Sequence, residues 1–411
     1  MVKHKIISET QFGFQAGKST IDVVNKLLNL ITDALENRCI TLSVFLDLCK
    51  AFDCVDHKIL LKKLRSYGIR GVALSWIKSY LTDRSQQVQV NNKLSRNSKL
   101  NFGVPQGSIL GPILFLLYVN NVDSSIENGQ IVKYCDDANL CFKSKNVFNL
   151  EINTYVELNS CIQYFENINL QSNADKTNYM VFETRHTVNE YRPAVFLDEV
   201  LLDEVDSTKF LGIFLDKGLT WNTHVDYVCK RLSLNIYVLR HIAKHCSLPV
   251  LRMAYYGLIH PHISYGVALW GSCPNASFQR IFRLQKKAIR IILRLKPRES
   301  CRDVFKDLNI LPFPCVYIYE TIIFCRFKCD LVRGRDVHEH NTRGRNNPRV
   351  AQHRLNLYEN LPSQAGVRFM SRLPDNIKHE INTLSFKKNL KRYLAEHCFY
   401  SIEEWMMHAN M

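Results

Sequence analysis

Two adjacent aspartates, Asp136 and Asp137, have the residue type and the surroundings of a metal site. They lie between two apolar segments rich in β-forming residues, 131–134 and 138–142, which predicts a β-hairpin with the acidic pair at or near its turn. Neighbouring side chains of a strand point to opposite faces, so the two carboxylates cannot both enter one core. Carboxylates this close repel each other unless a cation lies between them.

A third aspartate, Asp47, follows the apolar run 41–46, which predicts a buried strand that ends on this residue. A carboxylate beside a buried strand is costly unless a cation or hydrogen-bond donors satisfy it. Carboxylates from separate strands that meet at one place supply the oxygen ligands for two-metal phosphoryl transfer. For each feature alone an ordinary interpretation stays open: a strand-end aspartate for Asp47, and turn chemistry for the pair.

The elements expected to position these aspartates include a glycine-rich turn and several helices. Residues 102–112 contain glycines and a proline before an apolar helix predicted over 113–122, so that backbone can approach a ligand at the helix N-terminus. Periodicity predicts further helices over 21–37, 50–67, 72–83, 147–167, 220–239, 249–265 and 384–398. Strands are expected at 87–90, 176–182 and 209–216.

One motif invites a different chemistry. Residues 13–19 match the phosphate-binding pattern GxxxxGK[ST]. No strand precedes the motif, and phenylalanines flank the residues that would have to approach phosphate. We therefore interpret Ser19 and Thr20 as the cap of the helix at 21–37 rather than as part of a nucleotide-hydrolysing loop.

The charge of this 411-residue chain is unevenly distributed. The net charge is +16; residues 1–200 carry 22 Lys and Arg against 20 Asp and Glu, whereas residues 201–411 carry 32 against 18. A near-neutral part that holds the acidic pair, joined to a basic part, is typical of a catalytic module attached to a polyanion-binding region. A surface for acidic protein or membrane is the alternative. The candidate nucleic-acid-binding residues lie at helical spacing in an acid-free stretch: Arg283, Lys286, Lys287, Arg290 and Arg294.

The cysteines and the apolar runs bear on location. Most of the fourteen cysteines lie inside apolar segments, which is typical of reduced thiols in an intracellular protein. No signal peptide is recognisable, and the longest apolar run, 109–119, is too short to span a bilayer. We expect residence in the nucleus or cytoplasm, no secretion and no membrane partner. Cys325 and Cys329 with His338 and His340 match zinc-site spacing poorly, and no zinc is expected.

Three ordered segments together resemble the motifs of reverse transcriptases: 45–53, 103–112 and 134–137. In detail they are most similar to non-LTR (LINE-type) retrotransposons, particularly the jockey-like and CR1-like groups. Other stretches resemble further parts of that family: 11–20 the segment before the first catalytic motif, 173–182 the lysine-bearing motif, 210–212 the primer grip, and also 265–271 and 373–378. The resemblance covers nearly the whole chain.

This resemblance implies an α+β fold with a right-hand polymerase palm, an antiparallel sheet packed on helices. The implied organisation is partial fingers at 1–40, a palm with inserted finger elements at 41–218, a helical thumb-like region at 219–300, and a basic region at 301–411 that binds RNA or DNA. The implied activity is RNA-directed DNA polymerisation, which copies an RNA template into cDNA from a DNA primer or target and dNTPs.

The family's site residues carry over by position. The resemblance implies that Asp47, Asp136 and Asp137 bind two Mg²⁺ ions, for which Mn²⁺ can substitute. Phe52 would clash with a nucleotide 2′-OH, although a core phenylalanine is the alternative. Lys176 would lie near the leaving pyrophosphate, although an exposed lysine is the alternative. The remaining residues implied in substrate and primer binding are Gln106, Gly107, Phe210, Leu211 and Gly212.

The chain also departs from the family. Cys49 replaces the usual Ser, Cys135 the commoner Ala, and Ala16 an expected basic residue. The family carries further finger strands before the segment that begins at Gln11, and often an endonuclease domain before those, so we expect an N-terminally truncated chain. The alternative hypothesis is an inactive remnant that binds nucleic acid without polymerising.

Overall fold

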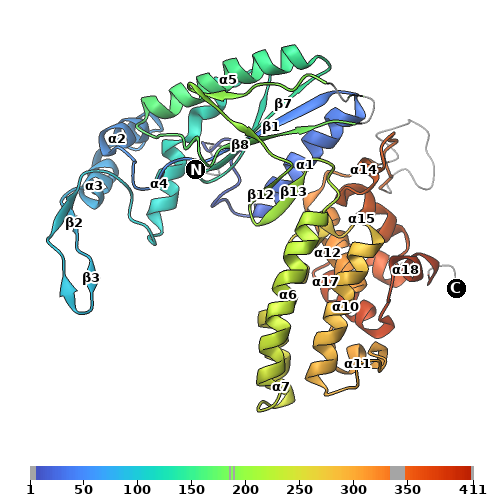
Figure 1. The fold of residues 1–411 in the computed structure, drawn as a ribbon. Helices are drawn as coiled ribbons and strands as arrows, with labels where there is room; N and C mark the ends of the chain where they lie inside the picture. Colours follow the sequence, from blue (N-terminus) through green and yellow to red (C-terminus); the bar gives the residue numbers. More distant parts are fainter. Residues whose placement is uncertain (1–5, 185–186, 188–189, 334–347, 409–411) are drawn as a thin grey trace. The chain divides into compact units, whose positions relative to one another are not determined.

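The computed structural model describes residues 6–184, 187, 190–333 and 348–408. The chain divides into two compact units, Met1–Asp206 (unit 1) and Ser207–Met411 (unit 2), and each is described by itself. Helices and mainly antiparallel sheets are both present, so the expected α+β class is confirmed (Figure 1). The subdomain limits expected at residues 40, 218 and 300 are not marked by this division and stay predictions.

Unit 1 is built on a five-stranded sheet with the order β11-β8-β1-β7-β6. The central strand β1 pairs antiparallel with β7 on one side and with β8 on the other, and all seven of its residues are buried. Among the strand pairs of this sheet in the described residues, β11–β8 is the parallel one. The strand bounds are β1 (Ile40–Leu46), β6 (Gln130–Tyr134), β7 (Asp137–Ser144), β8 (Asn178–Phe182) and β11 (Asp203–Glu204).

Two helices, α1 (Thr20–Glu36) and α5 (Val147–Asn167), pack on this sheet. Leu42 and Val44 of β1 share a hydrophobic cluster with the inner face of α5. The alternate residues Thr41 and Ser43 point to the opposite face, and they too are fully buried. Helix α1 contacts β1, β6 and β7. Both faces are therefore covered, which explains why all seven residues of β1 are buried, Thr41 and Ser43 included.

The helix predicted over 50–67 begins later than expected. The chain turns after β1, with Lys50 in the left-handed region (φ 42°), and α2 starts only at His57. Asp56 caps it by accepting hydrogen bonds from the Lys58 and Ile59 amides. The helix predicted over 113–122 is α4 (Leu110–Tyr118), followed by a 3₁₀ helix (Asn120–Ser125).

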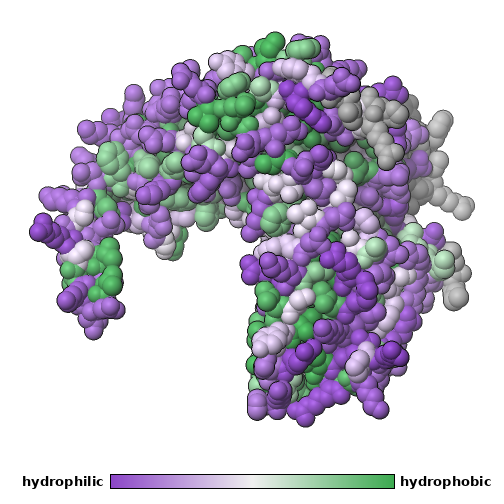
Figure 2. Space-filling view, viewed as in Figure 1, coloured by the Kyte–Doolittle hydropathy of each residue, from purple (hydrophilic) through white to green (hydrophobic). Residues whose placement is uncertain are grey.

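The remaining elements of unit 1 are helices α2 (His57–Ser66) and α3 (Gly71–Leu81) and the short strands β2 (Arg84–Gln86), β3 (Gln89–Val90), β4 (Lys93–Leu94), β5 (Ser98–Leu100), β9 (Phe196–Leu197) and β10 (Val200–Leu201). Strands β2 to β5 form a projecting hairpin (Figure 1). Val88, Val90 and Leu94 are exposed on it, and Figure 2 shows hydrophobic colouring there. Of the strand predicted over 87–90, only Gln89–Val90 is strand (β3), and residues 87 and 88 lie between β2 and β3.

Unit 2 begins with the hairpin of β12 (Ser207–Phe210) and β13 (Ile213–Asp216), and the other named elements in its described residues are helices. Helix α6 packs against α10, and α12 packs against α9, α15 and α17. The helix predicted over 249–265 is broken at Ile259, just before Pro261. The helices are α6 (Asn222–Ile242), α7 (Leu248–Leu258), α8 (His260–Ser264), α9 (Val267–Trp270), α10 (Asn275–Ile292), α11 (Arg302–Asp307), α12 (Phe313–Lys328), α14 (Asn356–Glu359), α15 (Pro362–Ser371), α16 (Asp375–His379), α17 (Phe386–His397) and α18 (Ile402–His408).

From the sequence we also expect no membrane-spanning helix and no zinc site. Across the described part of the chain, no helix combines the length and apolar character needed to cross a membrane. Of the weak zinc pattern, Cys325 lies in α12 and Cys329 directly follows it, whereas His338 and His340 lie outside the described residues.

Candidate active site

Asp136 and Asp137 lie where the pattern predicts, at the tight turn between β6 and β7. Tyr134 pairs with Asp137, so Cys135 and Asp136 form a two-residue turn and Asp137 is the first residue of β7. Cys135 has left-handed backbone (φ 64°), a conformation that favours glycine and strains other residues. We call residues 130–144, which make up β6, the turn and β7, the acidic hairpin.

Asp47 is brought to the same end of the sheet by strand register. Leu46 at the end of β1 pairs with Ala138, so continuing the antiparallel register by one residue puts Asp47 opposite Asp137. On the other side of β1, Lys176 lies in the turn at 174–176 that precedes β8. Lys176 Nζ lies 3.9 Å from Asp47 Oδ2. The register of β1 with β7 and this ion pair bring Lys176, Asp47 and Asp137 together, and we call these three residues with the adjacent Asp136 the carboxylate row.

The backbone of Asp47 is held by the loop that leads into β8. The Asp47 amide donates to Thr177 Oγ1 at 3.2 Å, and the Asp47 carbonyl accepts from the Asn173 amide at 2.9 Å. Two residues on, the Cys49 amide donates to the Gln171 carbonyl at 2.8 Å. The segment at 171–177, which carries Lys176, is therefore fastened along the end of β1.

The electrostatics of the row show the mutual repulsion of its acids. The pKa of Asp137 is raised to about 6, first because the carboxylate loses hydration at the strand end, then because Asp136 and Asp47 are negatively charged. Part of Asp137 remains open to solvent. Burial and the charge of Asp136 also raise the pKa of the Cys135 thiol, which keeps it protonated.

The acids fit a divalent cation in donor chemistry. Mg²⁺ and Mn²⁺ prefer carboxylate oxygens, and a cation would relieve the repulsion that raises the pKa of Asp137. Within the described ranges, however, no three or more His, Cys, Asp or Glu side chains already form a group that could hold a metal ion. The fit therefore rests on residue type and adjacency, and metal binding by Asp47, Asp136 and Asp137 stays a prediction.

The sequence predicted that Phe52 lies in a helix, but the structure places it in the turn after β1. Its ring stacks on Phe115 of α4, with centroids 4.4 Å apart and planes 19° from parallel. Phe52 remains only partly buried, whereas Phe115 is fully buried. A ring backed in this way is rigid. Its predicted role at the nucleotide sugar stays open.

The glycine-rich loop is joined to the Phe52 turn by its backbone. The Val104 amide donates to the Phe52 carbonyl at 3.0 Å, and Gln106 Nε2 donates to Asp53 Oδ1 at 2.9 Å. A Cβ at Gly103 would lie 2.9 Å from the Asp53 carbonyl oxygen, so the close approach requires glycine. The structure thus brings Phe52, Gln106 and the following Gly107 together, with Gly107 also left-handed (φ 79°).

The predicted primer-grip residues form the turn of the β12–β13 hairpin in unit 2. Phe210 pairs with Ile213, and the turn residues Leu211 and Gly212 both have positive φ, 47° and 84°. This is the backbone that two-residue hairpins favour. Tyr265 Oη donates to the Leu211 carbonyl at 2.6 Å and supports the turn from outside.

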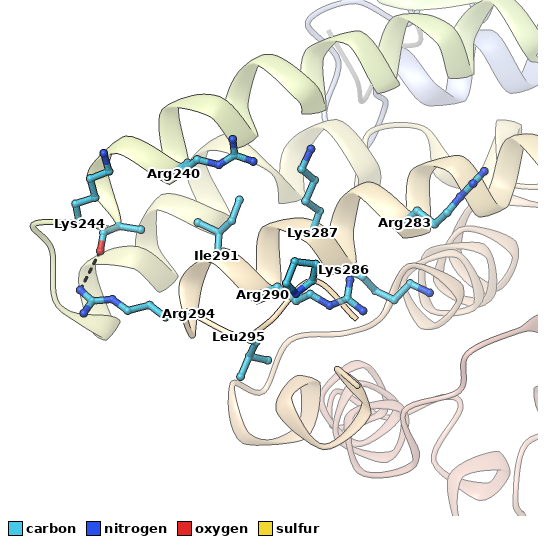
Figure 3. A pocket seen from close by; sticks show the side chains of 11 residues that line it. Arg240, Lys244, Arg283, Lys286, Lys287, Arg290, Ile291, Arg294 and Leu295 are labelled. Atoms are coloured by element: carbon cyan, nitrogen blue, oxygen red, sulfur yellow. Dashed lines mark hydrogen bonds between the residues drawn. The ribbon is translucent and has the colours of Figure 1, made fainter. Parts of the chain in front are cut away.

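A basic hollow of about 940 Å³ lies beside the C-terminal half of α10 and the end of α6 in unit 2 (Figure 3). All five cations predicted from the sequence line it, and no acidic side chain does. Sequence analysis missed two more that α6 brings to the hollow, Arg240 and Lys244; the basic end of that helix was the available signal. Arg294 is fixed by a hydrogen bond to the Ala243 carbonyl at 3.1 Å.

Carboxylates at one end of a helix-covered antiparallel sheet are typical of metal-dependent nucleotidyltransferases. The chain belongs to the reverse transcriptase (RNA-dependent DNA polymerase) family, whose model matches residues 1–215. The family expected from the motifs is therefore confirmed.

Similar proteins include two from Drosophila melanogaster. The chain is 29% identical over 326 residues to a probable RNA-directed DNA polymerase from transposon BS, covering 75% of this chain and 35% of that protein. It is 28% identical over 320 residues to the RNA-directed DNA polymerase from mobile element jockey, covering 74% and 34%. The chain thus matches about a third of the length of these relatives.

Among solved structures, the chain is similar to telomerase from Candida tropicalis in complex with a TWJ fragment of telomeric RNA. The TM-score is 0.42 at 12% identity, over 94% of this chain and 53% of that one. The apo form of telomerase from the same species gives a TM-score of 0.40 at 12% identity, over 95% and 57%.

Proposed function

We propose that this chain carries the polymerase part of an RNA-directed DNA polymerase from a non-LTR mobile element. It would copy an RNA template into cDNA from a DNA primer and dNTPs, inside the cell, in the nucleus or the cytoplasm. The observation that carries the proposal is the carboxylate row: in a chain of the reverse transcriptase family, strand register sets Asp47 opposite Asp137, next to Asp136.

In this proposal Asp47, Asp136 and Asp137 hold two Mg²⁺ ions. When bound, these ions supply activation of the primer 3′-hydroxyl and neutralisation of triphosphate charge. Lys176, whose side chain is 69% exposed beside Asp47, neutralises or protonates the leaving pyrophosphate. Lys176 is the cation of the carboxylate row, so its ammonium group can attract an anionic leaving group.

Sugar selection and strand binding are assigned to other residues. The ring of Phe52, stacked on Phe115, occupies the space that a ribose 2′-OH would need and so favours dNTPs. Gln106 and Gly107 contact the templating base pair and the nucleotide. The turn at Leu211 and Gly212 contacts the primer, and the basic hollow binds backbone phosphates, which adds affinity without sequence readout.

The test is primer extension on an RNA template with dNTPs and Mg²⁺. We expect Asp136→Ala to lower the rate more than about 100-fold, since even partners outside the first ligand shell cost 10- to 100-fold. The matched control is Asp203→Ala, which removes an exposed acid from β11 at the far edge of the same sheet. If Asp136→Ala extends the primer as well as the wild type, the site assignment is wrong.

A second candidate function is nucleic-acid binding without polymerisation. The observation that favours it is the basic hollow, which is built entirely from unit 2 and needs none of the carboxylates. Under this alternative neither the wild type nor Asp136→Ala extends a primer, while both bind primed RNA equally. The same assay therefore separates the two functions.

A further inference from the structure

The segment before α1 adds a short edge to the acidic hairpin. Gln11 forms a parallel bridge with Lys133 of β6. The Lys133 amide donates to the Thr10 carbonyl, and the Phe12 amide donates to the Lys133 carbonyl, both at 2.9 Å. Residues 10–12 thus pair with β6 two residues before the turn that holds the acids.

The side chain of Gln11 reaches past this pairing to the turn itself. Gln11 Oε1 accepts from the Cys135 amide at 3.0 Å and from the Gly13 amide at 2.8 Å. Gln11 Nε2 also donates to the Cys135 carbonyl at 3.4 Å. Gln11 is 2% exposed, so one buried amide binds both backbone polar groups of the strained turn residue.

The surrounding backbone is shaped to this contact. A Cβ at Gly13 would lie 2.6 Å from the Cys135 nitrogen, so only glycine allows the two segments to approach. Gln11 is itself held, because its carbonyl accepts from Lys18 Nζ at 2.8 Å. Lys18 immediately precedes Ser19, whose capping box starts α1. The turn is therefore linked to the N-terminus of α1 through Gln11.

We propose that Gln11 is a positioning residue for the metal-binding acids. It touches no substrate; it fixes the left-handed backbone of Cys135 and thereby the place of Asp136 and Asp137. The inference rests on the proposed function in one respect, that these acids hold the metals. Without the hydrogen bonds with Gln11, the turn would relax from its strained conformation and the carboxylates would occupy a wider range of positions. Metal binding would then weaken, because it needs a defined geometry of oxygen ligands.

The experiment measures the turn directly, by hydrogen exchange of the peptide 131–137 in metal-free protein. Gln11→Met keeps the length of the side chain but removes its hydrogen bonds. We expect exchange in this peptide to accelerate about tenfold, the effect of losing a buried hydrogen-bond partner. In the enzyme assay we expect a higher Mg²⁺ concentration for half-maximal rate and a lower kcat, with unchanged affinity for primed RNA.

The matched control is Asn120→Leu. Asn120 is also a buried amide bonded to the same N-terminal segment: its Oδ1 accepts from the Ser8 amide at 2.9 Å and its Nδ2 donates to the Ile6 carbonyl at 2.6 Å. It forms none of the bonds to Cys135, so its loss should destabilise unit 1 and leave both readouts of the turn unchanged. Gln11→Asn, one methylene shorter, serves if the Met variant does not fold.

Equal exchange of residues 131–137 in the Gln11 and Asn120 variants would overturn the proposal, and so would a Gln11 variant whose turn loosens without any change in the Mg²⁺ requirement. Failure of the polymerase assignment is distinct, because the exchange experiment needs no activity. If the turn loosens in Gln11→Met while Asp136→Ala keeps full activity, the catalytic interpretation of the acids is wrong, but Gln11 still holds the turn in place.

Discussion

At the scale of single residues, the acids of the carboxylate row destabilise one another when no metal is present. Loss of hydration, and then the negative charges of Asp136 and Asp47, raise the pKa of Asp137 to about 6, and the two charges are the part of this shift that is due to repulsion. Lys176 lies beside Asp47, but at 3.9 Å it makes a loose ion pair. The row therefore exchanges stability for the capacity to bind cations, as functional sites commonly do.

We expect Asp137→Asn to stabilise the metal-free protein at pH 7. A raised pKa means that the folded state holds this proton more tightly than the unfolded state, so the wild type loses stability as pH rises from about 4 through about 6. The gain should be about 1 kcal/mol, less than the full linkage value because solvent screens a partly exposed carboxylate. It should be much smaller near pH 4 and vanish below about pH 3, where Asp137 is protonated in both folded and unfolded wild type.

Urea unfolding in EDTA at pH 7 and pH 4 measures this difference. Mg²⁺ should stabilise the wild type at pH 7 and stabilise Asp137→Asn less, because the variant has lost one carboxylate ligand. An Asn variant that is less stable than wild type at pH 7 would show that Asp137 is not repelled by its neighbours.

The sequence pointed to the acidic residues of the candidate site, but it did not point to Gln11, the residue that holds their turn in place. Asp47, Asp136 and Asp137 carry a local pattern, because each follows or interrupts an apolar β-forming run. Gln11 carries none: its partner Cys135 is 124 residues away, and a side chain that bonds to backbone places no demand on the type of residue it contacts. Such contacts depend on tertiary register and are invisible to periodicity.

At the scale of elements, the β12–β13 turn depends on one glycine. We expect Gly212→Ala to destabilise unit 2 by about 1–2 kcal/mol, because its φ of 84° strains any residue with a Cβ. The new Cβ would also lie 3.2 Å from the Tyr265 ring.

The control for this prediction is Gly257→Ala, within α7 of the same unit. There a Cβ meets nothing within 4 Å and the backbone is helical, so alanine should stabilise by about 0.5–1 kcal/mol. Thermal or urea unfolding of both variants measures the pair. Equal effects of the same sign would contradict the role assigned to the turn.

Helices were predictable from sequence where one face is apolar and the capping residues lie next to the helix end in the sequence. The helix expected at 147–167 has those bounds in α5, and the cap expected at Ser19 forms a capping box with Asp22. The start of α2 was missed because apolar spacing continues through 50–56, while the chain there makes a left-handed turn at Lys50. That turn follows from contacts with the loop at 171–177, which local sequence does not reveal.

At the scale of the whole molecule, the positive charge is concentrated in unit 2, and its effect should be salt-dependent. We expect the double variant Arg283→Ala and Lys287→Ala, two exposed cations of the basic hollow, to bind single-stranded RNA about tenfold more weakly. The slope of log affinity against log salt should become shallower by about one to two, since each lost phosphate contact removes roughly 0.7.

Fluorescence anisotropy across a salt series gives both quantities. The control variant, Lys388→Ala and Arg392→Ala, removes the same charge from exposed positions of α17 that do not line the hollow. If both double variants weaken binding equally, net charge rather than the hollow determines affinity.

The strand order of unit 1 has a consequence for synthesis on the ribosome. All seven residues of β1 are buried in the folded protein, yet its partners β7 and β8 arrive only after the chain has grown to Ser144 and Phe182. At roughly 5–20 residues per second, the interval from Leu46 to Phe182 lasts roughly 7–27 s. During that time at least one edge of β1 lacks its partner, and both edges lack one until β7 has been made, so we expect the nascent chain to need chaperones or rapid docking of α1 to avoid aggregation.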